Sequence, residues 1–344
     1  MPGRPQEEGW TPEKDERLMR LRAELGPKWL DIAEAIGGHS TEACRFRYNT
    51  LKRDGLVPKV VPLHNPKDDE PADALWERVK QRTKRDVERH KKLRFVDAHL
   101  PDTGVVAITV VSDQHIRETG PVDIERMEED ALLIRDTPGC YGILGGDGVD
   151  NHIKHLTAMR HGGTNPKEEW KMYDHYLSFF GDKLLAVISG NHDDWTTDQA
   201  GVGVIERLAK DRKLFFAPDE VVVRLVVGQE TYKVKVRHQY RFNSEFNKTH
   251  TVKRLWEMGL DDFDVGVVCH HHEAALEPFV KHGRVVWGAR PGSYQITSAY
   301  SRQKGYNQTF PTCPTFLFWP DSHYVLGFLD LRDALRHLTA CRAA

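Results

Sequence analysis

Three short amphipathic patterns separated by glycines occupy the first 55 residues of the chain. Thr11 stands before Pro12 at the head of the first pattern, and Ser40 stands before the third. A hydroxyl side chain accepts hydrogen bonds from the free N–H groups of a first helical turn, and glycine allows the backbone to leave a helix. The patterns therefore predict a three-helix module over residues 1–55, with helices near 12–25, 28–36 and 41–53.

Residues 56–100 lack a regular hydrophobic period. Prolines and acidic residues alternate up to Asp73, which is typical of a linker. From Leu75 to Arg94 the chain then carries nine Lys or Arg against three acidic residues, a net charge of +6 with little apolar surface. This stretch predicts a solvated connecting helix, and contact with a phosphate backbone is a second interpretation of it.

From Val105 onward, short β-branched runs alternate with helical stretches. Such alternation predicts an α/β domain, which we place at residues 101–344. Helices are expected at 124–135 and 166–180, and strands at 105–111, 141–144, 184–189, 221–227, 232–236, 265–268 and 324–329.

Composition supports a globular protein and excludes several classes. Hydrophobic residues make up 39% and charged residues 29% of the 344 residues, enough to bury a core. The five cysteines lack paired spacing, which excludes a disulfide framework and a thiolate zinc site. No apolar run approaches a membrane span or a signal-peptide core, so we expect a cytoplasmic protein. Because the net charge is only −2, nucleic-acid affinity must come from local basic patches.

Polar clusters follow five of the predicted strands, where carboxyl ends of strands converge on one crevice. Carboxylate and imidazole ligands without thiolate suit Mn, Fe, Zn or Ni, with Mn²⁺ as our first expectation. Two ions about 3.5 to 4 Å apart need a shared carboxylate, and Asp147 is the natural bridge. Side chains two apart in a strand point the same way, so we expect two pairs to aim into one pocket. The residues are Asp113 with His115, Asp147, Asn191, His238, and His270 with His272.

Each cluster taken alone has an ordinary structural interpretation. An isolated Asp-x-His, a turn at Gly146 or a chance run of histidines is more often surface or core than a metal site. His271 is expected to face away as a bystander. The clusters favour a site because they occur together, in one order, each at the end of a predicted strand.

In this order the motifs resemble those of the calcineurin-like metallophosphoesterases: Asp-x-His, Gly-Asp-x-x-Asp ending at Asp150, Gly-Asn-His-Asp ending at Asp193, a lone His, and x-His-x-His. Cys269 stands where that family usually has glycine. The resemblance implies a four-layer α/β/β/α sandwich holding two divalent metal ions. One ion would be held by Asp113, His115, Asp147 and His272, and the other by Asp147, Asn191, His238 and His270.

The resemblance also implies the catalytic roles. A metal-bridging hydroxide would attack the phosphorus in line, and His192 would stay off the metals and assist the leaving group. We therefore expect His192 and the ligand Asp113 to be catalytic residues.

The first 55 residues resemble a Myb or SANT repeat, with Trp10, Trp29 and Tyr48 as its large aromatics. In such repeats the third helix enters the major groove of DNA. We expect the three aromatics to pack together. Two alternatives stay open: SANT repeats bind proteins, and some of the arginines could serve only to pair with acidic helices. The expected DNA contacts are Arg45, Arg47, Lys52 and Arg53.

Three functions follow from these patterns. The first is a DNA nuclease or phosphodiesterase, because a DNA-binding module and a basic helix precede the metal site. The second is a phosphomonoesterase acting on nucleic-acid ends, nucleotides or phosphoproteins. The third is a non-catalytic DNA-binding protein. The combination of modules suggests a bacterial or phage origin.

Further polar and aromatic residues follow the metal-site loops and are candidates for substrate contact. One set could bind substrate phosphates: Arg117, Asn151, His155, Arg160 and His161. The other mixes aromatics and bases in a way that could line a strand path: Tyr294, Tyr300, Arg302 and Lys304.

Overall fold

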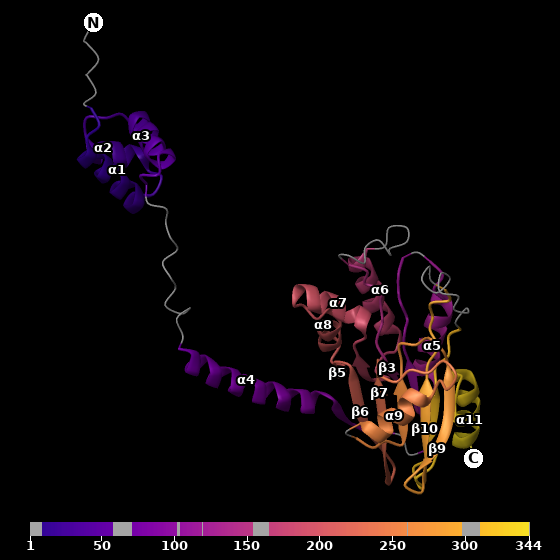
Figure 1. Cartoon of the computed structure of the whole chain (residues 1–344). Coiled ribbons are helices and arrows are strands. Elements are labelled where there is room, and N and C mark those ends of the chain that lie inside the picture. The colour runs from indigo at the N-terminus through magenta and orange to yellow at the C-terminus, as the bar shows by residue number, and fades with distance from the viewer. Residues whose placement is uncertain are drawn as a thin grey trace. The chain divides into compact units, whose positions relative to one another are not determined.

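The computed structural model describes two compact units, residues 1–82 and 83–344 (Figure 1). The described residues are 9–57, 71–101, 104–118, 120–153, 165–259, 261–297 and 310–343.

The first unit contains the three predicted helices, α1 (Pro12–Leu25), α2 (Trp29–Ile36) and α3 (Thr41–Arg53). The predicted caps form: Thr11 Oγ1 accepts from the Lys14 N–H at 3.3 Å, and Ser40 Oγ accepts from the Ala43 N–H at 3.1 Å. A small core closes the bundle, formed by buried Leu18, Ile32, Ala33, Ile36, Cys44 and Leu51.

The aromatic packing of this unit differs in part from the prediction. Trp29 and Tyr48 pack edge to face with ring centroids 5.5 Å apart, and the Arg22 guanidinium lies over both rings. Trp10 instead stacks on His39, with centroids 4.0 Å apart. The three aromatics therefore make two separate ring contacts, and all of them pack against the core of the bundle.

The basic stretch forms the predicted helix, α4 (Ala72–Leu93), and β1 (Phe95–His99) follows it. The sequence does not predict this strand, since residues 56–100 show only linker and helix patterns. β1 pairs in parallel with β6 (Glu220–Val227) from Phe95↔Val222 to His99↔Val226. A five-residue run carries little periodicity of its own, and its partner lies more than a hundred residues away.

The second unit begins at residue 83, before the predicted start of the α/β domain at residue 101, and contains two mixed six-stranded sheets. The first has the order β12-β11-β2-β3-β4-β5, in which β2 to β5 run parallel. Its strands are β12 (Val325–Phe328), β11 (Thr315–Phe318), β2 (Val106–Val111), β3 (Cys140–Leu144), β4 (Leu184–Ile188) and β5 (Phe216–Ala217).

The second sheet has the order β1-β6-β7-β8-β10-β9, with β7, β8 and β10 parallel. Besides β1 and β6 it contains β7 (Glu230–Arg237), β8 (Val265–Val268), β10 (Arg284–Arg290) and β9 (Ala275–Lys281). The sequence patterns do not predict β5, β9, β10 or β11.

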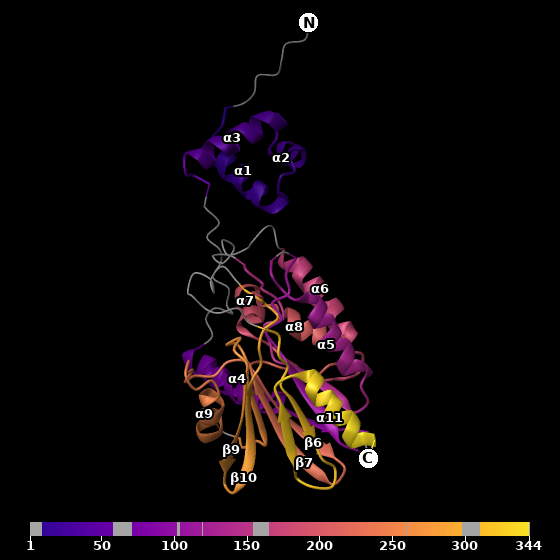
Figure 2. The same cartoon turned by 90° about the vertical axis from the view of Figure 1, so that its right-hand side faces the viewer.

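The sheets share a buried apolar core in which Ile108 and Ile143 of one sheet pack with Val223 and Val267 of the other. The strands of the first sheet also contribute to a second core, which contains residues of α5 (Ile124–Asp136), α6 (Pro166–Phe179) and α11 (Leu331–Ala343). On the second sheet, α9 (His250–Met258) packs through Val252 and Leu255 (Figure 2).

Candidate metal centre

Five loops bring the candidate ligands together. They follow β2, β3, β4, β7 and β8, and the parallel pairing β2–β3–β4 sets the first three side by side at the carboxyl ends of their strands. Asn191 and His192 open α7 (Asn191–Ala200), which starts directly after the β4 loop. The prediction that these clusters converge on one crevice matches the observed topology.

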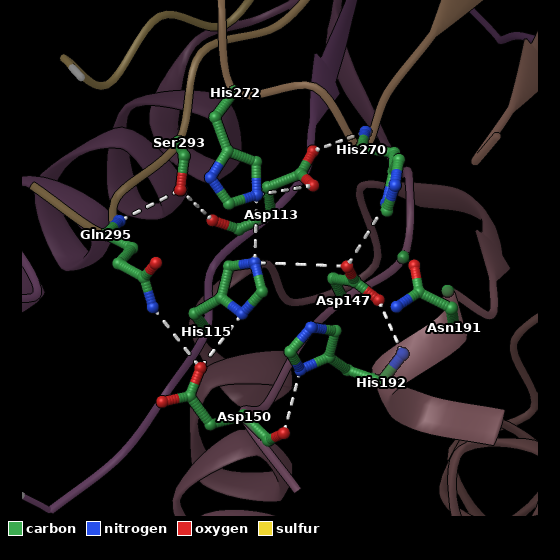
Figure 3. A network of polar contacts seen from close by, with 12 residues as sticks. Asp113, His115, Asp147, Asp150, Asn191, His192, His270, His272, Ser293 and Gln295 are labelled. Carbon is green, nitrogen blue, oxygen red and sulfur yellow. Dashed lines mark hydrogen bonds and ion pairs between the residues drawn. The ribbon is translucent and has the colours of Figure 1, made fainter. Parts of the chain in front are cut away.

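The first group of potential metal ligands consists of Asp113, His115 and His272, whose ligand atoms lie within 4.8 Å of one another. His272 Nε2 lies 3.2 Å from Asp113 Oδ1 and 3.0 Å from His115 Nε2 (Figure 3). Asp147 Oδ2 lies 3.9 Å from His115 Nε2, so this carboxylate borders the group.

The second group consists of Asp147, His238 and His270. Asp147 Oδ2 lies 3.2 Å from His238 Nε2 and 3.9 Å from His270 Nδ1. The Asn191 Oδ1 atom lies 3.2 Å from His238 Nε2. One oxygen of Asp147 thus faces imidazoles of both groups, which is the position that a bridging carboxylate occupies.

Two observations show that this donor set suits divalent cations. Among the described residues, the buried atoms Asp113 Oδ1 and His270 Nδ1 make no hydrogen bond of acceptable geometry, and the polar side chains facing them, His272 and Asp147, belong to the same two groups. Buried polar atoms are usually hydrogen-bonded. In addition, the imidazole nitrogens of His115 and His272 face each other. Carboxylate oxygens and imidazole nitrogens bind several divalent metals, so the site fits a metal without selecting one.

The ligand-bearing loops have a strained backbone. A positive φ is uncommon for a non-glycine residue and costs about 1–3 kcal/mol for each such residue. Backbone strain of this kind clusters at functional sites. From the sequence, strand alternation is expected to aim both paired ligands into one pocket. This explanation is wrong, because the pairs lie in left-handed turns that follow the strands. The φ angles are 56° at Asp113, 49° at His115, 53° at Asp147, 72° at His270 and 58° at His272.

Asp150 orients His115 from behind. Its Oδ1 lies 3.0 Å from His115 Nδ1, which leaves Nε2 to face the centre, and its Oδ2 accepts from Arg117 Nη1 at 2.8 Å. Burial disfavours the imidazolium, but the hydrogen bond with Asp150 and the negative charges of Asp150, Asp147 and Asp113 together outweigh burial and raise the pKa of His115. A carboxylate behind a ligating histidine is a common way to fix its tautomer.

Arg117 and Asn151 therefore have structural partners instead of the substrate contacts considered above. Arg117 is buried against Asp150. The Asn151 side chain donates to the His192 carbonyl at 2.7 Å and accepts from Thr196 at 2.9 Å. Their sequence neighbours His155, Arg160 and His161 lie outside the described residues.

Asp193 joins two of the loops, a role that the sequence alone does not assign to it. Its carboxylate accepts from the Asp147 and Gly190 N–H groups, both at 2.8 Å, and from Gly148 N–H at 3.1 Å. The side chain is fully buried. Asp193 thereby fixes the bridging carboxylate relative to the start of α7. The sequence signal that could have identified this role of Asp193 is its place in the Gly-Asn-His-Asp motif.

His192 lies beside the centre on the first turn of α7. Its Nδ1 lies 2.8 Å from the Asp150 carbonyl oxygen, so this nitrogen carries the proton. Its backbone N–H donates to Asp147 Oδ1 at 2.9 Å, and its ring lies 4.1 Å from that of Trp195. Burial lowers the pKa of His192 to about 4, although Asp147 opposes this.

Gly190 has no side chain, and the Asp147 carboxylate occupies the space that a side chain would fill. A Cβ added to Gly190 would collide with Asp147 Oδ1 and would lie 2.7 Å from His238 Cε1, whereas its φ of −107° suits any residue. We expect Gly190→Ala to cost about 1–3 kcal/mol of stability through overpacking and to weaken metal binding. Thermal unfolding and metal titration measure both effects. Gly203→Ala is the control, since its Cβ meets Glu206 at an ordinary 3.4 Å; equal effects at both sites would contradict the prediction.

The expected DNA contacts on α3 separate into two kinds. Arg47 forms a two-pronged ion pair with Asp15 of α1, at 2.8 and 2.5 Å, so it pairs with an acidic helix as the alternative interpretation held. Arg45 and Lys52 are exposed, and exposed Arg53 contacts Asp54 at 3.2 Å. The exposed basic surface of α3 is therefore Arg45, Lys52 and Arg53.

Of the four residues proposed to line a strand path, the structure describes only Tyr294. Tyr294 is fully buried, and its hydroxyl donates to Asp130 at 2.8 Å, which ties the loop after β10 to α5. Tyr300, Arg302 and Lys304 lie outside the described residues.

Comparison with known protein families gives a match for the first module. Residues 7–52 match the family described as the Myb-like DNA-binding domain. The Myb-like module thus covers the three-helix unit, as the sequence predicted. In a search of curated proteins, none matches the chain. Within the described residues, no helix is both long and apolar enough to cross a membrane.

Solved structures resemble the chain only distantly. Vps29 of Chaetomium thermophilum is 12% identical with a TM-score of 0.37, and the match covers 65% of this chain and 96% of that one. Sulfate thiohydrolase SoxB of Thermus thermophilus is 13% identical with a TM-score of 0.36, covering 71% and 61%. Scores this low decide neither fold nor activity, so the geometry of the site carries the functional argument.

Proposed function

We propose that this protein is a two-metal phosphoesterase that hydrolyses phosphodiester bonds in DNA, on a four-layer α/β/β/α metallophosphoesterase fold. The observation that carries the proposal is the shared Asp147 carboxylate, whose Oδ2 faces His115 on one side and His238 and His270 on the other. A bridged pair of sites is the arrangement used for in-line displacement at phosphorus.

The proposed ligands divide as the two groups of side chains do. Asp113, His115, His272 and Asp147 would hold one ion, and Asp147, Asn191, His238 and His270 the other. Bound divalent ions, with Mn²⁺ expected first, lower the pKa of water toward 7 and polarise phosphoryl oxygens. The chain itself positions the ligands: Asp150 fixes the His115 tautomer, and Asp193 fixes the Asp147 loop.

His192 is the proposed general acid. Because its Nδ1–H is directed to the Asp150 carbonyl, Nε2 is the atom available to the substrate. A phosphate anion beside the ring favours the imidazolium, which would offset the effect of burial on its pKa. Nε2 would then donate a proton to the departing oxygen. The Asp150 carbonyl holds the ring in this orientation throughout.

DNA is the proposed substrate because the Myb-like module presents a basic surface on α3. Basic side chains that contact phosphates position a protein on DNA without reading its base sequence. The module would therefore bring the enzyme to DNA. The proposed test uses purified protein with Mn²⁺ and three substrates: single-stranded DNA, duplex DNA and p-nitrophenyl phosphate. Cleavage of DNA is expected. Hydrolysis of the monoester alone would favour the phosphomonoesterase, and hydrolysis of none would favour a non-catalytic DNA-binding protein.

The exposed basic surface of α3 allows a separate test of DNA binding. Arg45→Ala and Lys52→Ala should weaken duplex binding and reduce the slope of log Kd against log salt by about 1 for each phosphate that the variant no longer neutralises. Fluorescence anisotropy over a salt series measures the slope. Arg20→Ala removes an exposed arginine of α1 and serves as the control. If all three variants keep the wild-type slope, the module docks on a protein instead.

A further inference from the structure

Trp195 lies one turn after His192 on α7 and packs directly against it, with ring centroids 4.1 Å apart. The His192 ring in turn meets the ring of the candidate ligand His115 edge to face, with centroids 4.7 Å apart (Figure 3). Direct side-chain contacts therefore connect the Trp195 indole to the candidate metal centre through one intervening residue.

Core packing does not explain this tryptophan. Its side chain is half-buried and belongs to none of the apolar cores that the described residues form. Within α7 only Asp193 is buried. A tryptophan in a core buries a large apolar area, and elsewhere its ring commonly serves as a contact surface. Trp195 is therefore a candidate for contact with a ligand.

His152 completes a triangle of rings around Trp195 and His192. Its ring centroid lies 5.9 Å from that of Trp195, with the planes 28° apart, and 5.7 Å from that of His192. Two rings on opposite faces of the indole would be separated by nearly the sum of their distances to it, which is much more than 5.7 Å. Neither histidine thus lies across the indole from the other, and one indole face carries neither ring.

Hydrogen bonds fix the turn that carries the indole. The Asn151 side chain donates to the His192 carbonyl at 2.7 Å and accepts from the Thr196 hydroxyl at 2.9 Å. These two partners stand on either side of Trp195 in the chain. An aromatic ring on a prearranged turn loses less entropy when it binds a ligand. The indole is thus positioned before a substrate arrives.

We propose that Trp195 binds the nucleobase of the nucleoside that departs from the scissile phosphate. His192 is the proposed proton donor to the departing oxygen, so the leaving nucleoside lies on the His192 side of the phosphorus. One sugar separates that oxygen from its base, and the indole face that carries neither histidine offers the base a flat apolar surface. This inference rests on the proposed function, in that it takes the leaving group to be a nucleoside and His192 to face it.

The contact defines a class of substrate without defining a sequence. Aromatic side chains stack on every nucleobase, because each base has a π-face. Stacking on Trp195 therefore favours nucleic acids over small diesters that lack a base. It also favours a segment whose bases are not covered by neighbours, since a base stacked within a duplex has no free face.

The test measures the contribution of the leaving base in the full chain with Mn²⁺. The substrates are the dinucleotide TpT and two analogues in which one or the other thymine is replaced by hydrogen. The nucleoside released without phosphate identifies the leaving side. In the wild type, removal of the leaving-side base should lower kcat/KM roughly 5-fold or more, chiefly through a higher KM. In Trp195→Ala, TpT and the leaving-side analogue should have equal kcat/KM values.

The ratio of these two kcat/KM values separates base stacking from mere support of His192. If Trp195 only supported His192, Trp195→Ala would slow all three substrates by the same factor and keep the wild-type ratio, which would overturn the inference. Trp195→Phe retains a ring face and should keep most of the base effect. Trp76→Ala removes an exposed tryptophan of α4 and should leave all three substrates unchanged.

The wild type alone can overturn the inference if Trp195→Ala misfolds, because equal cleavage of TpT and the leaving-side analogue would show that the base makes no contact. If the wild type cleaves none of the three substrates, the proposed function is wrong, and binding decides the inference. Calorimetric titration should then show tighter binding of TpT than of at least one analogue, and Trp195→Ala should remove this difference. Equal affinities of the wild type for all three would overturn the inference.

Discussion

His192→Ala is expected to lower kcat for DNA cleavage by about 10²- to 10⁴-fold, the usual contribution of a positioned general acid. The two metal ions should remain bound, because the ligand atoms lie on other side chains and the backbone N–H of residue 192 still reaches Asp147. Rates under single-turnover conditions together with metal content by mass spectrometry measure the two effects separately.

A second variant and a control keep this prediction specific. His192→Asn retains a side-chain N–H for the Asp150 carbonyl but cannot transfer a proton, so its kcat should fall like that of the alanine variant. His175→Ala removes an exposed histidine of α6 and should leave kcat unchanged. Wild-type kcat in both His192 variants would show that the histidine only packs against Trp195.

Asp147→Ala is expected to abolish activity by removing the ligand that both sites share. Asp147 Oδ2 is the common neighbour of His115, His238 and His270, so neither group of ligands stays complete. Metal content should fall from about two ions per chain, as two-metal phosphoesterases hold, to less than one. kcat should fall at least as far as in His192→Ala.

Thermal unfolding with and without metal provides the decisive measurement for Asp147→Ala. An ion at one hundred times its Kd stabilises the wild type by about 2.7 kcal/mol, whereas the variant should gain little. Asp219→Ala removes a carboxylate outside both ligand groups and should keep the metal-dependent stabilisation. If Asp147→Ala retained two ions, the bridging role would be contradicted.

The order of element types was predictable because its signals are local. Thr11 and Ser40 cap α1 and α3 at the expected positions, since an N-cap hydrogen bond spans only three residues. The buried β-branched runs of β2, β4 and β8 were likewise recognised. By contrast, β1 and β9 were missed, because these strands lie at the edges of a sheet and have no fully buried position to mark them.

The candidate site shows the same division. The residue types and their order along the chain were enough to propose the ligands. The place of His192 off the metals came from the family resemblance and stays a prediction, because His192 also forms a possible ligand group with His115 and Asp147. The reason offered for their direction was wrong: left-handed turns at Asp113, His115, His270 and His272 aim the side chains, not strand alternation. Backbone strain of this kind exists only because the surrounding fold enforces it.

Residue chemistry and local signals determined the Myb-like module, the α/β class and the set of carboxylates and imidazoles. Tertiary structure alone decided which groups meet. It placed His272 3.2 Å from Asp113 across 159 positions of sequence, directed Arg47 to Asp15, and gave Asp193 three backbone donors from two loops. Such contacts depend on the packing of whole sheets, and no pattern within a few residues carries that information.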